Sequence, residues 1–124
     1  METAFLLLML TMNGAGEVSA SFVNTDSQAA CEKRARLVGS ILEKNAKDVT
    51  IVESRCVESA LRFTKYSHDL AEDAPRYSYL VSLGADGAAL VEMQAGDSEC
   101  RAEKTRREAA GGKHYCATSR QELQ

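Results

Sequence analysis

The sequence predicts an α+β domain in which two tandem ββαβ units form one mainly antiparallel sheet with two helices packed on one face. Three observations predict this class: β-rich runs separated by turn residues, a helical pattern after the second run of each unit, and one cysteine pair in each unit. The units cover about 4–59 and 77–119, and an acidic linker over 60–76 joins them. We expect the two copies to combine into a single domain over 1–124, about a pseudo-two-fold axis.

Length and composition favour one shared core. The chain has 124 residues, of which 44% are apolar, and it contains no Trp, so the core is expected to be mainly aliphatic. Each half, at roughly 60 residues, would be marginal if it folded alone, and a shared sheet is therefore expected. The net charge is -3. Because a nucleic-acid binder usually carries a basic surplus, no nucleic-acid partner is expected.

The first unit opens with a hairpin. Phe5–Met12 is a continuous apolar run of strand length, as in a strand that is buried on both faces. Residues 13–16 (NGAG) follow, and their Asn-Gly pair favours the positive φ angles of a hairpin turn. Glu17–Val23 then alternates between polar and apolar residues, which predicts a half-buried second strand.

A helix and a third strand complete this unit. Residues 24–27 (NTDS) are a cluster of N-cap residues, and a helical pattern runs from there to Lys44, with Asn45 expected to end it. Apolar positions at steps of four, three and four form its inward face. These positions are Cys31, Ala35, Val38 and Leu42, with Leu37 and Ile41 widening the stripe. The β-rich residues 49–57 (VTIVESRCV) then predict a strand that carries Cys56 near its end.

The linker has two parts. Residues 61–66 alternate in polarity and could extend the sheet, whereas 68–75 (HDLAEDAP) has the composition of an exposed acidic connection. Pro75 disfavours a helical conformation at Ala74. A helix across the join between the units is therefore not expected.

The second unit repeats the order of elements. Its first strand ends at Leu83, Asp86-Gly87 predicts a hairpin turn, and its second strand covers 88–93. Asp97 or Ser98 is expected to cap the helix, and Gly111-Gly112 to end it before the last strand around 114–116. Residues 100–110 (CRAEKTRREAA) include few apolar side chains. This helix is therefore expected to lie shallowly on the sheet.

Four cysteines, Cys31, Cys56, Cys100 and Cys116, allow three disulfide pairings, and none of them forms a C-x-x-C motif. The repeat selects Cys31–Cys56 and Cys100–Cys116, because each pair then joins the start of a helix to the following strand. A bridge that closes a loop of this size stabilises the fold by about 3 kcal/mol in the chain-entropy model. Such bridges persist in an oxidising compartment.

The expected compartment depends on residues 1–20. If they form a strand, the protein is expected to be cytoplasmic; if they are a signal peptide cleaved after Ala20, it is expected to be periplasmic or secreted. Residues 4–12 have the length of a signal-peptide core, but the first basic residue is Lys33 and a hairpin pattern follows, so we favour the strand. The apolar run is too short to span a membrane, which takes about 20 residues.

Few residues suggest chemistry. His114 and Cys116 share one face of the last predicted strand, as a Cys–His dyad requires, but a disulfide cysteine beside a surface histidine is the simpler interpretation. The four cysteines with His68 and His114 could bind zinc, although only His114 and Cys116 have a chelating spacing. His68 and the acidic residues of 69–73 fit a solvated linker better than a cation site. We therefore expect no catalytic residue, cofactor or metal site.

Basic residues fall on both predicted helices. On one shared face they could form a single basic surface, but Glu residues interrupt each run, which favours solvated helix faces. They are Lys33, Arg34 and Arg36 in the first helix, and Arg101, Lys104, Arg106 and Arg107 in the second.

The function that these features favour is a small non-enzymatic interaction or structural module. It would present a sheet edge or a helix face to a partner protein or to a second copy of itself. One alternative is a thiol-dependent enzyme or redox protein that uses Cys116 and His114. The other is a nucleic-acid-associated protein that uses the basic helix faces.

Overall fold

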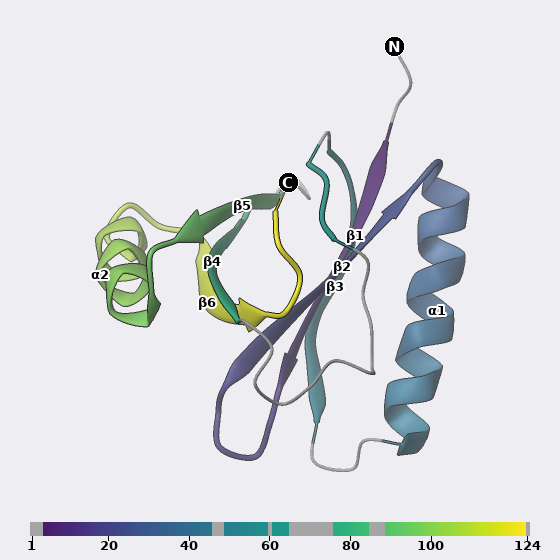
Figure 1. Cartoon of the computed structure of the whole chain (residues 1–124), viewed down its shortest axis with the longest axis horizontal. Coiled ribbons are helices and arrows are strands. Elements are labelled where there is room, and N and C mark those ends of the chain that lie inside the picture. Colours follow the sequence, from purple (N-terminus) through teal and green to yellow (C-terminus); the bar gives the residue numbers. More distant parts are fainter. Residues whose placement is uncertain (1–3, 46–48, 60, 65–75, 85–88, 124) are drawn as a thin grey trace.

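The computed structural model describes residues 4–45, 49–59, 61–64, 76–84 and 89–123 (Figure 1). It shows an α+β fold, as the sequence predicts, with two helices and one curled, six-stranded mixed sheet. The elements in chain order are β1 (Phe5–Met12), β2 (Val18–Thr25), α1 (Gln28–Asn45), β3 (Thr50–Glu58), β4 (Tyr77–Leu83), β5 (Ala89–Gln94), α2 (Asp97–Glu108) and β6 (Lys113–Ser119).

The strands lie in the order β3-β1-β2-β6-β4-β5. The pairings within each half are antiparallel, but β2 and β6 are parallel where the halves meet, through Ser19 opposite Thr118. The sheet is therefore mixed. The second strand of one half adjoins the third strand of the other, so the two halves follow each other head to tail in the strand order. The expected pseudo-two-fold axis stays a prediction.

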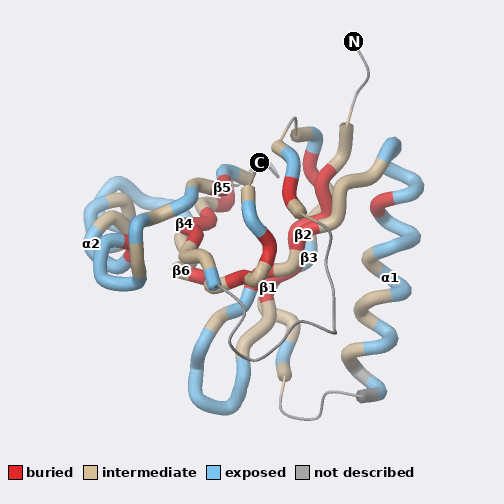
Figure 2. Tube along the Cα trace, in the orientation of Figure 1, coloured by how far each residue is buried: buried red, intermediate tan, exposed pale blue. Residues whose placement is uncertain are grey.

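The core lies on the inner, concave face of the curled sheet, where the buried residues of both halves meet (Figure 2). Leu6, Leu8 and Leu10 of β1 point into it because alternate residues of a strand face the same side. From the other half, Tyr79 and Val81 of β4 point into the same core. All the residues from Leu6 to Leu10 are buried, so β1 is covered on both faces, as its continuous apolar run predicts.

Aromatic rings connect the two halves inside this core. The ring of Phe22 on β2 stacks on that of Phe63, with centroids 3.8 Å apart, and both rings meet Tyr79 edge to face. Such pairs stabilise a core by about 0.5–1.5 kcal/mol beyond their area burial. At another point of the inner face, Arg55 of β3 donates a hydrogen bond to the carbonyl of Gly84, across the curl of the sheet. The two halves therefore share one core.

The helices cover the outer face of the sheet, each held by one disulfide. Cys31 near the start of α1 is bonded to Cys56 of β3, and Cys100 near the start of α2 to Cys116 of β6. These are the two pairs that the order of elements predicts. Because the sheet curls, α1 and α2 lie on opposite sides of the molecule (Figure 1). The single basic surface that the two helices could have formed is therefore not present.

Turns and caps differ in detail from the sequence predictions. In the β1–β2 turn the positive φ angle, 82°, falls on Gly16 rather than on the Asn-Gly pair, and the Asn13 side chain accepts hydrogen bonds from the backbone of Ala15 and Glu17. Ser27 caps α1 by accepting a hydrogen bond from Ala30 N–H. The N-cap of α2 is Gly96, without a side-chain cap bond, and Asp97 is instead the first helical residue.

Several sequence predictions concern the linker and the second hairpin. The Asp86-Gly87 turn and residues 65–75 lie outside the described residues. Within 61–64, the predicted extension of the sheet is reduced to one isolated bridge between Phe63 and Leu123. As expected from its composition, α2 lies shallowly, with Cys100 as its buried residue.

Candidate functional site

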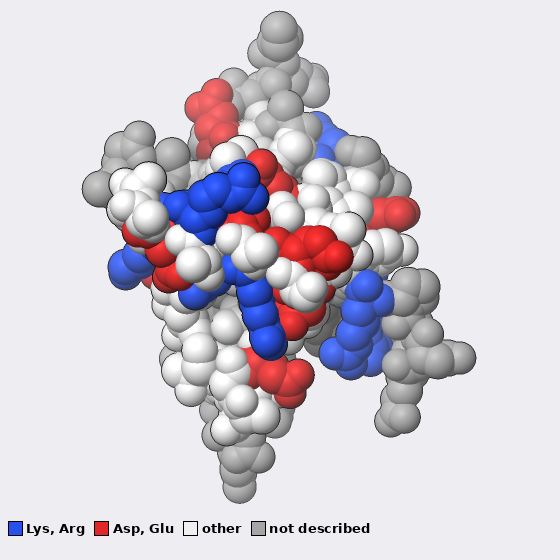
Figure 3. All heavy atoms as spheres, turned by 90° about the vertical axis from the view of Figure 1, so that its left-hand side faces the viewer, with Lys and Arg blue, Asp and Glu red and all other residues white. Residues whose placement is uncertain are grey.

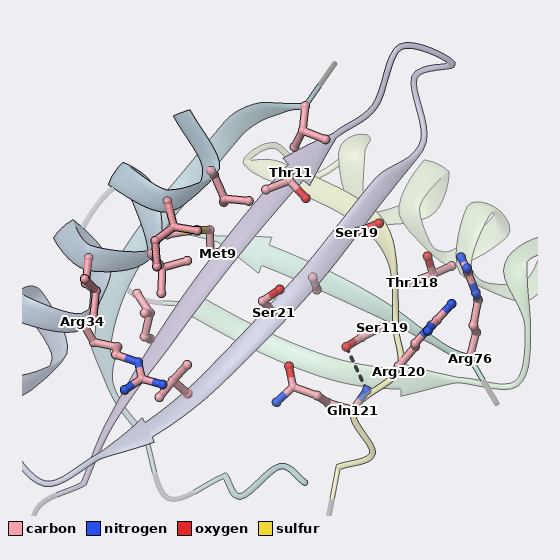
Figure 4. A pocket seen from close by; sticks show the side chains of 18 residues that line it. Met9, Thr11, Ser19, Ser21, Arg34, Arg76, Thr118, Ser119, Arg120 and Gln121 are labelled. Atoms are coloured by element: carbon pink, nitrogen blue, oxygen red, sulfur yellow. Dashed lines mark hydrogen bonds between the residues drawn. The ribbon is translucent and has the colours of Figure 1, made fainter. Parts of the chain in front are cut away.

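A groove of about 520 Å³ lies between α1 and the outer face of β1 and β2 (Figure 4). It continues past β2 to the segment Thr118–Gln121, which follows the parallel junction of β2 with β6. Below, it is called the α1 groove. Its volume falls within the range of pockets that bind compact ligands, about 300–1,000 Å³.

The side of the groove next to α1 is apolar. Its floor includes Leu7 and Met9, the outward-facing residues of β1, and its wall includes Val38 and Leu42 of α1. The rim of this wall is formed by Leu37 and Ile41. The disulfide of the fully buried Cys31 holds α1 against the sheet near the start of the helix. Further along α1, its apolar face is only partly covered.

The exposure of the rim corrects the sequence prediction for the helix. Leu37 and Ile41 are expected to widen a buried stripe, yet they are 55% and 47% exposed. The two side chains therefore present apolar surface to the solvent beside an apolar floor.

The opposite side of the groove is polar. Ser19 and Ser21 of β2 face it, together with Thr118 and Ser119 at the end of β6. Arg76, just before β4, and Arg120 stand at this end of the groove, while Arg34 of α1 lies at the other end (Figure 4). Among the described residues that line the groove there is no Asp, Glu or Lys. The groove thus combines apolar surface, hydroxyl groups and positive charge.

Gln121 positions the polar wall. Its side chain is 3% exposed, and its amide accepts a hydrogen bond from Phe22 N–H at 2.9 Å and donates one to Phe22 C=O at 2.7 Å. A second bond from the same amide nitrogen reaches the carbonyl of Thr64 at 2.7 Å. The Tyr79 hydroxyl donates to the carbonyl of Gln121 and accepts from Leu123 N–H. This network fixes the C-terminal segment beside β2.

The Cys–His dyad, the less favoured interpretation of the sequence, does not form in this structure. Cys116 is bonded to Cys100, and Nδ1 of His114 lies 2.8 Å from the Ser82 hydroxyl. The other ring nitrogen, Nε2, lies 2.9 Å from the carbonyl of Gly111 and must carry a proton to bond with it. Nδ1 is then the acceptor for Ser82. Neither Cys116 nor His114 lines the α1 groove. The contacts of His114 with Ser82 and Gly111 connect β6 to β4 and to the turn after α2.

The candidate metal ligands that the structure describes form no metal site. His68 and the acidic residues of 69–73 lie outside the described residues. Elsewhere in the described part of the chain, no three His, Cys, Asp or Glu side chains gather as a metal site. All four cysteines are in disulfides.

Basic residues on α2 alternate with acidic ones over the face that this helix presents (Figure 3). Arg101 pairs with Asp97 and Lys104 with Glu108, each one turn apart on the helix. Arg107 pairs with both Glu103 and Glu92 of β5, and these bonds hold the pKa of the Glu92 carboxyl below its ordinary value. This helix face is therefore a network of ion pairs.

The sequence patterns did not identify the residues of the polar wall. Arg76 and Arg120 are far apart in sequence, and the antiparallel pairing of β4 with β6, which sets Tyr77 opposite Ser119, brings their segments to one place. The available signal was the polar face of the second strand, where Ser19 and Ser21 alternate with buried residues.

In the described part of the chain, no helix is long and apolar enough to cross a membrane. Comparisons with protein-family models, with curated proteins and with solved structures find no match for this chain.

Proposed function

We propose that this chain is a small, non-enzymatic, disulfide-stabilised module that binds a segment of a partner protein in the α1 groove. The observation that carries the proposal is the apolar rim of Leu37 and Ile41, which continues into the apolar floor below it. Burying a fully exposed side chain of this size contributes about 1.5–3 kcal/mol. These half-exposed residues therefore offer roughly half of that each to a partner that covers them.

The groove is a better candidate than the sheet edges for this contact. Along the β3 edge, Glu53 and Arg55 place charges on the inner face, and inward charges are a common protection of edge strands. The β5 edge is short, at six residues. Self-association through an edge would have to overcome these features.

Two alternative functions receive less support. A thiol-dependent reaction would require reduction of the Cys100–Cys116 bridge, and His114 would then have to leave Ser82. A nucleic-acid site on the helices would use basic residues of α2 that are already paired with carboxylates. The thiol reaction and a nucleic-acid site on α2 would therefore need a rearrangement that the α1 groove does not.

We also infer that the two halves arose as a tandem repeat of one ββαβ unit. Leu8 lies opposite Phe22 in the first half, as Val81 lies opposite Val91 in the second, and these four residues share the core. Both disulfides join a helix start to a third strand with Cα atoms 5.9 Å apart. In the second half the helix is shorter and more polar, which makes α1 the helix that borders a groove.

The disulfides also bear on the cellular location of the protein. Two disulfides fit an oxidising environment, and we propose an extracytoplasmic location. Cleavage after Ala20 would remove β1, the strand between β3 and β2, together with Leu6, Leu8 and Leu10 of the core. A signal peptide cleaved after Ala20, the alternative to the favoured strand, is therefore difficult to combine with this sheet.

Site-specific photo-crosslinking tests the proposed function. A photoreactive benzophenone amino acid replaces Leu37, and in a control it replaces Leu90, which is 53% exposed but lies on β5 away from the groove. We expect position 37 to form a covalent adduct with a protein that mass spectrometry identifies, and Ile41→Ser to weaken that adduct. Absence of an adduct at position 37, or equal adducts at both positions, would contradict the proposal.

A further inference from the structure

The charge of the α1 groove is opposite in sign to that of the whole chain. The chain has a net charge of -3. The described residues that line the groove include Arg34, Arg76 and Arg120 and no Asp, Glu or Lys, so their sum is +3. Among the described residues, an acidic protein thus carries only positive side-chain charges along the α1 groove. Charge complementarity then calls for a partner that is negative where it meets Arg34 and Arg76.

Arg34 and Arg76 can receive carboxylates. Arg34 and Arg76 are exposed, and neither forms an ion pair with another described residue. Arginine binds a carboxylate through two parallel N–H···O bonds, a geometry that lysine does not offer. The hydroxyls of Ser19, Ser21 and Thr118 stand on the same polar side and can donate further hydrogen bonds.

The open rim distinguishes a polypeptide from a free amphiphile. Pockets for small ligands bury about 70–90% of the ligand surface. Here Leu37 and Ile41 form an open wall, 55% and 47% exposed, along which an isolated alkyl chain would remain in contact with water. A peptide segment can cover the rim with some side chains and continue beyond the groove with others.

We infer that the segment bound in the α1 groove is an acidic, apolar peptide. Its aliphatic or aromatic side chains pack on Leu37, Ile41 and the floor of β1, and its Asp or Glu carboxylates pair with Arg34 and Arg76. This inference rests on the proposed function, since it specifies the partner of the same groove.

A random peptide library displayed on phage tests the inference with the intact, oxidised protein as bait. Selected peptides are synthesised with a fluorescein label, and their Kd values are measured by fluorescence polarisation. We expect them to combine Leu, Ile or Phe with an excess of Asp and Glu. Arg34→Gln and Arg76→Gln should each weaken binding about fivefold, in line with partly exposed ion pairs. Arg36→Gln, an exposed residue of α1 that does not line the groove, should leave the Kd unchanged.

The other outcomes separate this inference from the proposed function. Peptides that lose binding in a Leu37→Ser/Ile41→Ser variant, but show no acidic excess and do not respond to the arginine substitutions, would overturn the inference and leave the function standing. Selected peptides that are indifferent to both sets of variants would contradict both. Displacement of every peptide by dodecanoate at a lower concentration would overturn the peptide as occupant in favour of a free amphiphile. Unchanged far-ultraviolet circular dichroism and unfolding midpoints verify that each variant is folded.

Discussion

The side-chain amide of Gln121 forms two hydrogen bonds with the backbone of Phe22, one to its N–H at 2.9 Å and one to its C=O at 2.7 Å. These are the bonds that a neighbouring strand would make. β2 pairs with β6 in parallel through Ser19 opposite Thr118, and β6 then ends at Ser119. Gln121 therefore takes the place of a strand and satisfies backbone groups that would otherwise be buried without partners.

Replacing Gln121 by Met, a side chain of similar length, should destabilise the protein by roughly 2–4 kcal/mol. The substitution leaves the buried N–H and C=O of Phe22 and the C=O of Thr64 without these partners, and each such group costs about 1–3 kcal/mol, partly relieved by relaxation. Denaturant unfolding measures the change, with Glu122→Gln at the exposed neighbouring position as the control. A Gln121→Met variant within about 0.5 kcal/mol of the parent, the range of ordinary surface substitutions, would show that the amide does not perform this role.

Tyr79 should ionise only at high pH, and its ionisation should unfold the C-terminal segment. Burial raises the pKa of its phenol above the ordinary value of 10.0, against the lowering effect of the bond from Leu123 N–H. The neutral phenol is thus the form that the fold favours. The associated stability is fully present below pH 10 and is lost as the pH rises through the raised pKa.

Tyr79→Phe provides the comparison. It removes both hydrogen bonds to the C-terminal segment and should lower the free energy of unfolding by about 1–2 kcal/mol at neutral pH. Ultraviolet difference titration of the parent should show one late-ionising tyrosine that is missing in the variant. A parent protein whose four tyrosines all titrate together near the ordinary value would refute the buried phenol.

Glu92 should contribute stability at neutral pH that disappears in acid. Its hydrogen bonds from Arg107, followed by the charge attraction of the same residue, hold its pKa below the ordinary value of 4.5 despite some desolvation. A depressed pKa means that the stabilisation is present above the ordinary value and is lost as the pH falls through the folded-state value. Glu92→Gln should therefore unfold at a lower denaturant concentration than the parent at pH 7 and at the same concentration well below pH 4. Glu58→Gln, at the exposed end of β3, is the control for the loss of one carboxylate.

Local sequence patterns were sufficient for the elements but not for their assembly. The apolar run of β1 and the helical stripe of α1 predict these elements within a few residues of their observed bounds. The β2–β6 junction depends on pairing between strands about a hundred residues apart, which neither periodicity nor turn residues encode. The role of Gln121 could not be predicted, because in the sequence a single polar residue near the end of a chain looks like any solvent-exposed one.

The candidate groove could not be predicted from the sequence for the same reason. Leu37 and Ile41 have the spacing of buried helical residues, and only the position of α1 over the sheet decides that they form an open rim. Arg76 lies in the segment that the sequence predicts to be a linker, and only the fold brings it to the polar wall. By contrast, the element order alone predicts both cysteine pairs, since each bridge lies within one half.

The measurement that tests the ββαβ organisation of each half most directly is a disulfide map of the non-reduced protein. Trypsin cuts between all four cysteines, leaving Cys31 before Lys33, Cys56 in 56–62, Cys100 in 77–101 and Cys116 in 114–120. Mass spectrometry should find Cys31 linked to Cys56 and Cys100 linked to Cys116, the bonds that hold α1 and α2 on the outer face of the sheet. Any link between the two halves, such as Cys31 to Cys100, would contradict this fold and remove the basis for the α1 groove.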